Sequence, residues 1–396
     1  MTSLAWAVLM GAALLTAVPV AILAVQVVLA WKRPASVLPA SPARPGRITV
    51  LVPAHNEASG IGHMVECTLR HMPAGARLVA VADNCTDRTA ASAREAGAEV
   101  VERNDTTRRG KGFALDFGVR WLATDPPDIL IVLDADCEIH ADGIHRLAQH
   151  CLEHARPVQA LYLMRGSAPS NLRMRIAEFA WLFKNQVRPL GFARVGGPCQ
   201  LMGTGMAFPW ALIANVSLAN SHLVEDMKLG VDLALRGTPP RFAPDVLVTS
   251  SFPTSQEAIE SQRQRWEHGH LSMLGRTLPR LIATGIARAD LAALALAADL
   301  LVPPLALLVL VMVLVSALSL AAYLGFGWST PWAVSGIGWA FLCAVVLAAW
   351  YRHGRSVLSL SDLLSVPAYI LWKIPLYIRF ALNRQIEWVR TKRDDE

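Results

Sequence analysis

An apolar segment that ends in two aspartates is the feature that most restricts how this chain can fold. Residues 129–133 read Ile-Leu-Ile-Val-Leu, and Asp134 and Asp136 follow them, separated by one alanine. A short apolar run with β-branched residues is typical of a buried strand in a parallel sheet. Ligand sites of open α/β sheets lie just outside the carboxyl ends of the strands. We therefore expect both aspartates to lie at a binding site.

Two carboxylates this close in sequence repel each other unless a cation lies near them. Mg²⁺ and Mn²⁺ take oxygen ligands and commonly bridge a carboxylate to a phosphate of the substrate. We therefore expect Asp136, together with Asp134, to bind Mg²⁺ or Mn²⁺. The alternative is that the two acids only end the strand and cap the next helix, and the rest of the chain has to decide between these interpretations.

The sequence from residue 47 onward alternates strand and helix patterns. Strands are predicted at 48–52, 78–82, 98–101, 129–133 and 158–163. Helices are predicted at 60–71, 87–96, 112–123, 141–154, 171–187, 225–236 and from about 255. A turn of small residues is predicted at 203–208. This alternation predicts parallel βαβ units. The chain contains neither a Gly-x-Gly-x-x-Gly after the first strand nor a Gly-x-x-x-x-Gly-Lys-Ser/Thr, which argues against a dinucleotide dehydrogenase and a P-loop ATPase.

Several segments are long and apolar enough to cross a membrane. The chain of 396 residues is 53% hydrophobic, with a mean hydropathy of +0.36, which is too apolar for an ordinary soluble enzyme. Residues 1–31 carry no charge and precede Lys32 and Arg33, which indicates an uncleaved anchor and not a signal peptide. Residues 300–323 and 332–351 are also apolar and are each close to the length of a membrane-spanning helix. Residues 358–380 are expected to lie at the membrane interface, with a fourth span as the alternative.

Basic residues flank the apolar segments. The net charge of +6 could suggest a nucleic-acid partner, but this placement fits the positive-inside rule and anionic membrane lipids better, so no nucleic acid is expected. We expect a multi-pass protein of a bacterial-type inner (plasma) membrane whose α/β domain is cytoplasmic. The six cysteines show no Cys-x-x-Cys spacing, which argues against a zinc site and a disulfide framework.

These patterns divide the chain into five predicted parts. They are an N-terminal transmembrane anchor at 1–33, a proline-rich linker at 34–46, a cytoplasmic α/β domain at 47–275, two transmembrane helices at 276–355, and an amphipathic interfacial segment with a basic cytoplasmic tail at 356–396.

Short motifs follow the predicted strands in a characteristic order. They are Pro53–Glu57, Asp83, Arg109–Gly112, Asp134–Asp136, Glu225–Asp226 and Gln262–Trp266. Together, over residues 47–270, they resemble the family-2 glycosyltransferases of GT-A fold, in particular the membrane-bound cellulose, chitin and hyaluronan synthases. Ceramide glucosyltransferases share much of the signature. The resemblance implies an α/β, Rossmann-like nucleotide-sugar transferase domain with N- and C-terminal transmembrane helices.

The resemblance implies a UDP-sugar donor, and the residue types agree with it. Glu57 and Asp83 follow the first two strands, where carboxylates can accept hydrogen bonds from ribose and uracil. Arg109 and Lys111 offer cations for the diphosphate at a glycine-flanked turn. Asp136 would bind the metal that neutralises the departing diphosphate, and Asp134 would support both nucleotide and metal. The alternatives are a turn cap for Asp83 and a solvated surface position for Lys111.

The acceptor side of the predicted site involves two helices. Gln262, Arg265 and Trp266 share one helix face, where the arginine can pair with the diphosphate and the tryptophan can stack on an acceptor sugar. The alternative is that this tryptophan only lies at the membrane surface. The resemblance assigns the general base to Asp226, although Glu225 and Asp226 could both simply cap a helix.

We therefore expect an inverting, metal-dependent transfer of a hexose or N-acetylhexosamine from a UDP-sugar to a polysaccharide or lipid-linked acceptor. Val224 stands where the synthases have threonine, which weakens assignment to one subclass. A ceramide-glucosyltransferase-like glycolipid synthase is one alternative. A catalytically inactive membrane scaffold is another, which the intact acids disfavour. Three spans are few for a translocation channel, so export would require an oligomer or an export partner.

Overall fold

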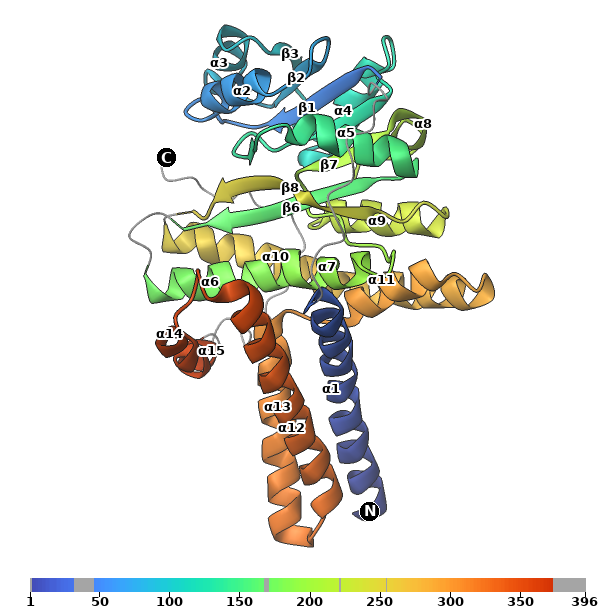
Figure 1. The fold of residues 1–396 in the computed structure, drawn as a ribbon, viewed down its shortest axis with the longest axis vertical. Coiled ribbons are helices and arrows are strands. Elements are labelled where there is room, and N and C mark those ends of the chain that lie inside the picture. Colours follow the sequence, from blue (N-terminus) through green and yellow to red (C-terminus); the bar gives the residue numbers. More distant parts are fainter. Residues whose placement is uncertain (1, 32–45, 167–170, 221, 254, 373–396) are drawn as a thin grey trace.

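The computed structural model describes residues 2–31, 46–166, 171–220, 222–253 and 255–372. One mixed sheet forms the centre of the upper part of the molecule in Figure 1, with strand order β3-β2-β1-β4-β7-β6-β8-β5. The strands are β1 (Ile48–Ala54), β2 (Arg77–Asp83), β3 (Glu99–Arg103), β4 (Ile129–Val132), β5 (Glu138–Ile139), β6 (Val158–Arg165), β7 (Met206–Pro209) and β8 (Arg241–Ser251).

The first half of the sheet follows the sequence prediction. Strands β1, β2, β3 and β4 run parallel, and α2 (Ile61–Arg70), α3 (Thr89–Glu95) and α4 (Lys111–Leu122) lie between them in sequence. All four residues of β4 are buried, which explains its uninterrupted apolar sequence. Because these strands are parallel, the loops after β1, β2 and β4 come together at one edge of the sheet.

The second half of the sheet is mixed, not purely parallel. Strand β7 runs antiparallel to both β4 and β6, whereas β6 runs parallel to β8. The prediction of a turn over 203–208 is therefore wrong for its last three residues, which belong to β7. Met206, Ala207 and Phe208 are fully buried between neighbouring strands, and small side chains alone did not distinguish a turn from this short strand.

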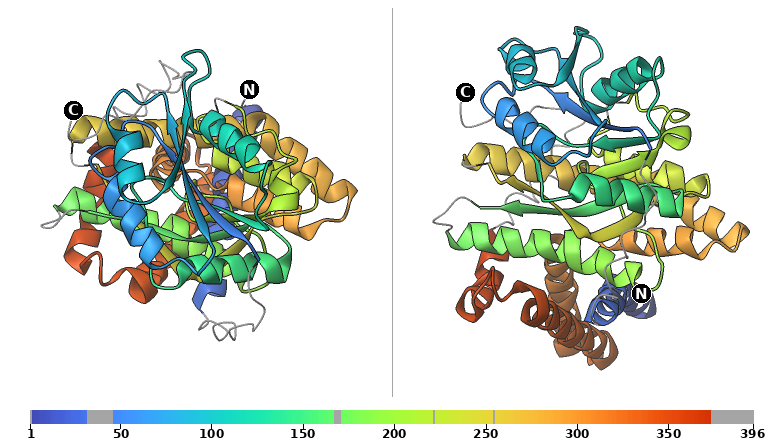
Figure 2. Two further views of the ribbon diagram at one scale, coloured as in Figure 1. Left: turned by 90° about the horizontal axis from the view of Figure 1, so that it is seen from above. Right: turned by 45° about the horizontal axis from the view of Figure 1, so that its top comes forward.

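A layer of helices lies between the sheet and the long apolar helices (Figures 1 and 2). It contains α6 (Leu172–Leu182), the π-helical segment η1 (Phe183–Val187), α7 (Arg188–Ala193), α10 (Gln256–Ala287) and α11 (Leu291–Leu301). The helix predicted over 171–187 therefore continues through a π-helical turn into α7. The domain boundary predicted at residue 275 falls inside α10, which continues to its C-cap at Arg288.

Other helices complete the domain. They are α5 (Gly143–His154), α8 (Trp210–Ile213) and α9 (Glu225–Leu235). Helix α9 begins at the predicted pair of acids, and its apolar face packs with α10 and α11 through Met227, Val231 and Leu296. This packing holds the first turn of α9 beneath the edge of the sheet.

Three helices of the described chain are long and apolar enough to cross a membrane: α1 (Thr2–Trp31), α12 (Leu305–Phe326) and α13 (Ser329–Ala349). They extend side by side away from the domain (Figure 1). Only 28% of the apolar window of each helix is buried within the protein, so most of their apolar side chains face outward, as expected for contact with lipid.

The segment after α13 consists of η2 (Trp350–Gly354), α14 (Leu360–Leu364) and α15 (Val366–Trp372). Arg175 of α6 forms an ion pair with Asp362 of α14, with 2.8 Å between Nη2 and Oδ1, so this segment is attached to the helix layer. The rest of the predicted interfacial segment and basic tail, from 373 to 396, lies outside the described residues.

A buried polar network joins the helix layer to α1. Asp299 of α11 accepts hydrogen bonds from Gln26 of α1 (2.6 Å), Gln200 (2.6 Å) and Arg188 of α7 (2.8 Å). All four side chains are buried. Helices α1 and α7 also approach closely, since a Cβ atom on Gly191 would lie only 2.1 Å from the carbonyl oxygen of Gln26. These contacts determine how the domain sits on its apolar helices.

We expect Asp299→Asn to destabilise this junction strongly, because it leaves the buried Arg188 guanidinium without its counter-charge. Breaking a buried ion pair from one side typically costs about 3–5 kcal/mol. Thermal unfolding of the detergent-solubilised protein measures the effect. Asp232→Asn, which removes an acid paired with Lys228 on the surface of α9, is the control and should shift the unfolding temperature little. Equal effects of the two substitutions would contradict the prediction.

Candidate active site

A cavity of about 1390 Å³ opens where the loops after β1, β2 and β4 face α9 and α10. Every residue predicted as a site residue lines it: Glu57, Asp83, Arg109, Lys111, Asp134, Asp136, Asp226, Gln262, Arg265 and Trp266. These residues span more than 200 positions of the sequence, and the fold brings them to one place. Their individual roles remain predictions.

The two aspartates after β4 belong to a group of side chains that could hold a metal ion. Ligand atoms of Asp134, Asp136 and Cys137 lie within 4.8 Å of one another. Burial raises the pKa of the Cys137 thiol well above its ordinary value, so the thiol is neutral and a poor ligand. The carboxylates provide hard oxygen donors, which fit Mg²⁺ or Mn²⁺.

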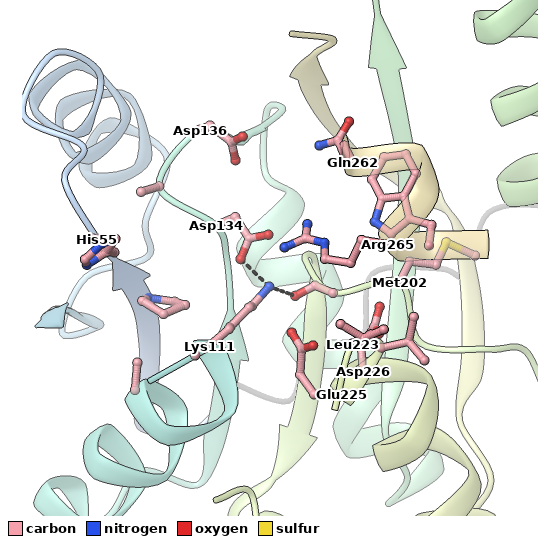
Figure 3. Close-up of a pocket in the computed structure, with 18 of the residues that line it drawn as sticks. His55, Lys111, Asp134, Asp136, Met202, Leu223, Glu225, Asp226, Gln262 and Arg265 are labelled. Atoms are coloured by element: carbon pink, nitrogen blue, oxygen red, sulfur yellow. Dashed lines mark hydrogen bonds and ion pairs between the residues drawn. The ribbon is translucent and has the colours of Figure 1, made fainter. Parts of the chain in front are cut away.

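Lys111, at the start of α4, lies among the acids. Its Nζ atom lies 2.5 Å from Oδ1 of Asp134 and donates a hydrogen bond to the carbonyl of Gly203 at 2.8 Å (Figure 3). Burial acts to lower the pKa of Lys111, but the carboxylates of Asp134, Glu225 and Asp226 outweigh burial and raise it. Lys111 is therefore a permanent cation within an acidic cluster, not a solvated surface lysine.

The two acids that open α9 both line the cavity. Gly203 has φ = +91°, and a Cβ atom built on it would lie 3.3 Å from Oδ2 of Asp226 and 3.5 Å from Nζ of Lys111. Glycine therefore allows this loop to approach both side chains. Burial, and then the nearby Asp226 carboxylate, raise the pKa of Glu225 to about 7.

Asp83 is held by a partner that the sequence analysis missed. Nη1 of Arg103 donates to Oδ1 of Asp83 at 2.6 Å, and both side chains are less than 10% exposed. Burial raises the pKa of Asp83, and Arg103 opposes that shift. Asp83 and Arg103 lie opposite each other at the ends of the paired strands β2 and β3. Their contact follows from the pairing of these strands, and no local sequence motif indicates it.

Glu57 and Arg109 line the cavity from two loops. Glu57 is buried after β1, and its backbone N–H donates to Oγ1 of Thr89 at 2.7 Å. Arg109 is exposed in the loop before α4, next to Gly110 with φ = +127°. The exposed guanidinium is free to approach a ligand in the cavity mouth.

Helix α10 presents the predicted face to the cavity. Gln262, Arg265 and Trp266 all line it, and the Arg265 guanidinium points toward Asp134 in Figure 3. The Nε atom of Arg265 is buried and makes no hydrogen bond within the described structure. A buried donor without an acceptor is unfavourable, so this arginine is suited to an anionic ligand.

Trp266 belongs to an aromatic cluster that the sequence analysis did not find. Its ring centroid lies 4.6 Å from that of Trp181, which in turn lies 5.6 Å from Tyr162 and 6.3 Å from Phe252. All four residues line the cavity. This position argues against the alternative that Trp266 only lies at the membrane surface. The four aromatic residues come from four separate segments of the chain. Their positions in the sequence therefore do not indicate that they form a cluster.

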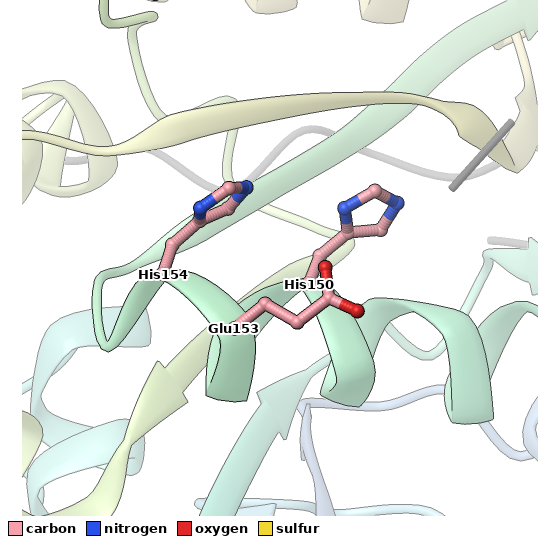
Figure 4. Close-up of side chains that lie close together, drawn as sticks. All are labelled: His150, Glu153 and His154. Carbon is pink, nitrogen blue, oxygen red and sulfur yellow. The ribbon is translucent and has the colours of Figure 1, made fainter. Parts of the chain in front are cut away.

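A second group of possible metal ligands lies on α5, outside the cavity. His150, Glu153 and His154 place ligand atoms within 4.8 Å of one another (Figure 4). His150 is bound to Asp245 of β8 at 2.9 Å, and burial and then the Arg241 cation lower the pKa of His154. Nearby positive charge also disfavours a metal ion, so we interpret this cluster as a contact between α5 and β8.

Comparison with protein families gives a direct match. The model of a family described as glycosyltransferase-like family 2 matches residues 45–269. A 4,4′-diaponeurosporenoate glycosyltransferase of Staphylococcus haemolyticus (strain JCSC1435) is 28% identical over 201 residues, which cover 46% of this chain and 50% of that protein. Glucomannan 4-beta-mannosyltransferase 7 of Arabidopsis thaliana is 24% identical over 257 residues, which cover 59% and 44%. The chain thus spans about half the length of these curated relatives.

A solved structure shares the fold. The mannosyltransferase PcManGT from Pyrobaculum calidifontis, in complex with GDP-Man and Mn²⁺, matches with a TM-score of 0.52 and 18% sequence identity. The match covers 87% of this chain and 99% of that chain. The predicted α/β GT-A fold, with apolar helices at the N-terminus and in the C-terminal region, is confirmed.

We expect the stability of the protein to depend on pH through Glu225. Its pKa is about 7 in the folded state and 4.5 ordinarily, so the folded state holds this proton more tightly. The stabilisation is complete below pH 4.5 and is lost as the pH rises through 7. Glu225→Gln removes this dependence.

The unfolding temperature of Glu225→Gln, measured in EDTA, should therefore increase relative to the wild type as the pH rises from 5 to 8. Glu66→Gln, which changes an exposed acid of α2, is the matched control and should follow the wild type. Parallel pH profiles for the wild type and Glu225→Gln would show that the Glu225 pKa is not raised.

Proposed function

The chain belongs to glycosyltransferase-like family 2, and on this premise we propose that it is an inverting, metal-dependent enzyme with a UDP-hexose or UDP-N-acetylhexosamine donor. Its acceptor is a polysaccharide or a lipid-linked molecule at the cytoplasmic face of a membrane. The observation that carries this proposal is the single cavity in which the acids after β4, the acids of α9 and the Arg265 face of α10 meet.

The donor would occupy the side of the cavity formed by the parallel strands. Glu57 and Asp83 would contact ribose and uracil, with Arg103 holding Asp83 in place. Arg109 and Lys111 would approach the diphosphate from the turn before α4. Lys111 already compensates the Asp134 carboxylate, so it also stabilises the metal-binding group.

The residues present fit a divalent metal. Asp136 and Asp134 would hold Mg²⁺ or Mn²⁺, which would supply positive charge to the departing diphosphate. Arg265 would add a second positive group from α10, where its Nε atom is buried and lacks a hydrogen bond within the described structure. The presence of Mn²⁺ with GDP-Man in PcManGT supports this arrangement.

Asp226 would act on the acceptor side. Its carboxylate would take the proton from the attacking hydroxyl as the new bond to the anomeric carbon forms and the bond to the diphosphate breaks on the opposite face. The configuration at the anomeric carbon is therefore inverted. Gln262 would orient the acceptor, and Trp266 with its neighbour Trp181 would offer an aromatic surface for a sugar ring.

The membrane placement is part of the proposal. The three apolar helices would anchor residues 1–33 and 276–355 in a bacterial-type inner membrane, with the linker at 34–46 and the catalytic domain at 47–275 on the cytoplasmic side. The segment 356–396 would lie along the interface. Export of a product would need an oligomer or an export partner.

Of two other interpretations, one differs from the proposal only in its acceptor and the other is weaker. A ceramide-glucosyltransferase-like synthase would share the same donor site and differ only in its acceptor. An inactive scaffold would not require four acids, a permanently charged lysine and an arginine with a buried, unbonded Nε atom to converge on one cavity. The named relatives act on different acceptors and do not choose between polysaccharide and lipid.

We expect membranes containing the protein to transfer label from one member of a panel of radiolabelled UDP-hexoses and UDP-N-acetylhexosamines, with GDP-mannose included. Excess EDTA should abolish the transfer, and Mn²⁺ or Mg²⁺ should restore it, because the diphosphate needs a counter-charge. Asp136→Asn should weaken nucleotide binding as well as the rate. Asp142→Asn, at an exposed position before α5, is the control. Full transfer in EDTA would exclude the metal role.

We expect Asp226→Asn to lower the transfer rate by about 100- to 10,000-fold, the usual cost of losing a general base. Nucleotide-sugar affinity should change little, because the residue acts on the acceptor. Asp232→Asn on the same helix is the matched control. Near wild-type transfer by the Asn variant, or loss of donor binding in it, would remove the base assignment.

A further inference from the structure

The cavity extends from the donor side to the layer that rests on the apolar helices. Its membrane-side arm is lined by Trp181, Lys184, Asn185, Arg188, Gln200 and Asp299. These residues come from α6, η1, α7, α11 and the loop before β7, and the Asp299 network connects them directly to Gln26 of α1. A ligand in this arm would therefore lie close to the surface of the membrane.

The charges of this arm are not balanced. Arg188 is paired with Asp299, with Nη2 2.8 Å from Oδ1. Lys184 lines the same arm from η1, and its Nζ atom lies 5.4 Å from the ring centroid of Trp181. Within the described structure, no carboxylate lies within 4.0 Å of the Lys184 ammonium group. One positive charge of the arm thus lacks a counter-ion among the residues that the structure describes.

Lys184 is only half-buried, yet its surroundings disfavour its charge. Burial lowers its pKa, Arg188 lowers it further, and the more distant carboxylates of Asp226 and Asp299 act in the opposite direction. The carboxylates that act on Lys184 are therefore Asp226, which is the proposed base, and Asp299, which belongs to the membrane-side arm. An anionic group bound to Lys184 would supply the missing charge without displacing any ion pair of the protein.

We propose that the membrane-side arm binds an anionic group, a phosphate monoester or a carboxylate, on a membrane-borne acceptor, with Lys184 as the cation that holds it. This inference rests on the proposed function, since it names the class of acceptor. The Arg188–Asp299 pair forms a fixed polar floor, and the neighbouring rings of Trp181 and Trp266 line the same cavity. The attacking group of the acceptor then faces Asp226.

The chemistry of the arm favours a lipid over a soluble anion. The floor of the arm belongs to α7 and α11, and α7 packs directly on α1 at Gly191. An acceptor anchored in the bilayer would keep its apolar chain in the lipid beside the helix layer while its charged group reaches Lys184. A soluble anion would gain only the contact with the lysine.

The experiment measures ligand affinity for the full chain in dodecyl maltoside micelles by microscale thermophoresis. The probes are dodecyl phosphate, dodecanoate, dodecanol, inorganic phosphate and UDP-glucose with Mn²⁺. The wild type should bind dodecyl phosphate or dodecanoate at least about tenfold more tightly than dodecanol or inorganic phosphate. Lys184→Gln should weaken the amphiphilic anion by about 10- to 100-fold, as expected for a lost charge-assisted hydrogen bond, and should bind UDP-glucose as the wild type does.

Two further variants keep the result interpretable. Lys184→Arg retains the charge and should retain binding of the amphiphilic anion to within about threefold. Lys228→Gln removes a lysine that is paired with Asp232 on the surface of α9, and it should behave as the wild type. Retained binding of the anion by Lys184→Gln, or tight binding of dodecanol by the wild type, would overturn the proposal.

The remaining outcomes are also decisive. If inorganic phosphate bound as tightly as dodecyl phosphate, the site would take a soluble anion and the lipid assignment would be wrong. If Lys184→Gln lost UDP-glucose binding, Lys184 would belong to the donor site. If the wild type bound dodecyl phosphate through Lys184 but bound no nucleotide sugar from the donor panel, the proposed function would fail and the lipid could not be its acceptor.

Discussion

Electrostatic repulsion among four carboxylates is the constraint on which this site depends. Asp134, Asp136, Glu225 and Asp226 come from two distant parts of the sequence and line one cavity. Lys111 is bound to Asp134 and lies close enough to the α9 acids to be stabilised by them. Lys111 and Arg265 offer this cluster two positive charges against four acids, which favours protonation of some acids, as the raised Glu225 pKa indicates, or the binding of a cation.

The sequence predicted the donor half of the domain well, because its signals are local. Each parallel strand is a short apolar run, and the candidate acids lie at the end of a strand or within a few residues after it, so pattern and position coincide. Asp134 follows β4 in this way, and Asp83 ends β2. The order of strands along the chain was therefore sufficient to predict which side chains meet at the edge of the sheet.

Features that depend on tertiary contacts were not predictable in this way. Arg103 is paired with Asp83 through strand register, and Trp181 meets Trp266 only after α6 and α10 pack on the same sheet. Asp299 lies in an apolar helix, where a single acid gives no sign of its partners on α1 and α7. The mixed second half of the sheet was missed because β7 is only four residues long and because Pro244 and Asp245 interrupt the apolar pattern of β8, which was not predicted either.

The π-helical segment η1 sets the rotation of one part of the helix layer against the next. Each residue of an α-helix turns the chain by about 100°, and a π-helical turn contains one residue more than an α-helical turn. The extra residue lets Lys184 face the cavity while Gly191, further along the same continuous helix, faces α1. The orientation of the α/β domain relative to the three apolar helices is therefore set by a count of single residues. Deletion of a residue of this turn that does not line the cavity, such as Gln186, would therefore rotate these two faces relative to each other.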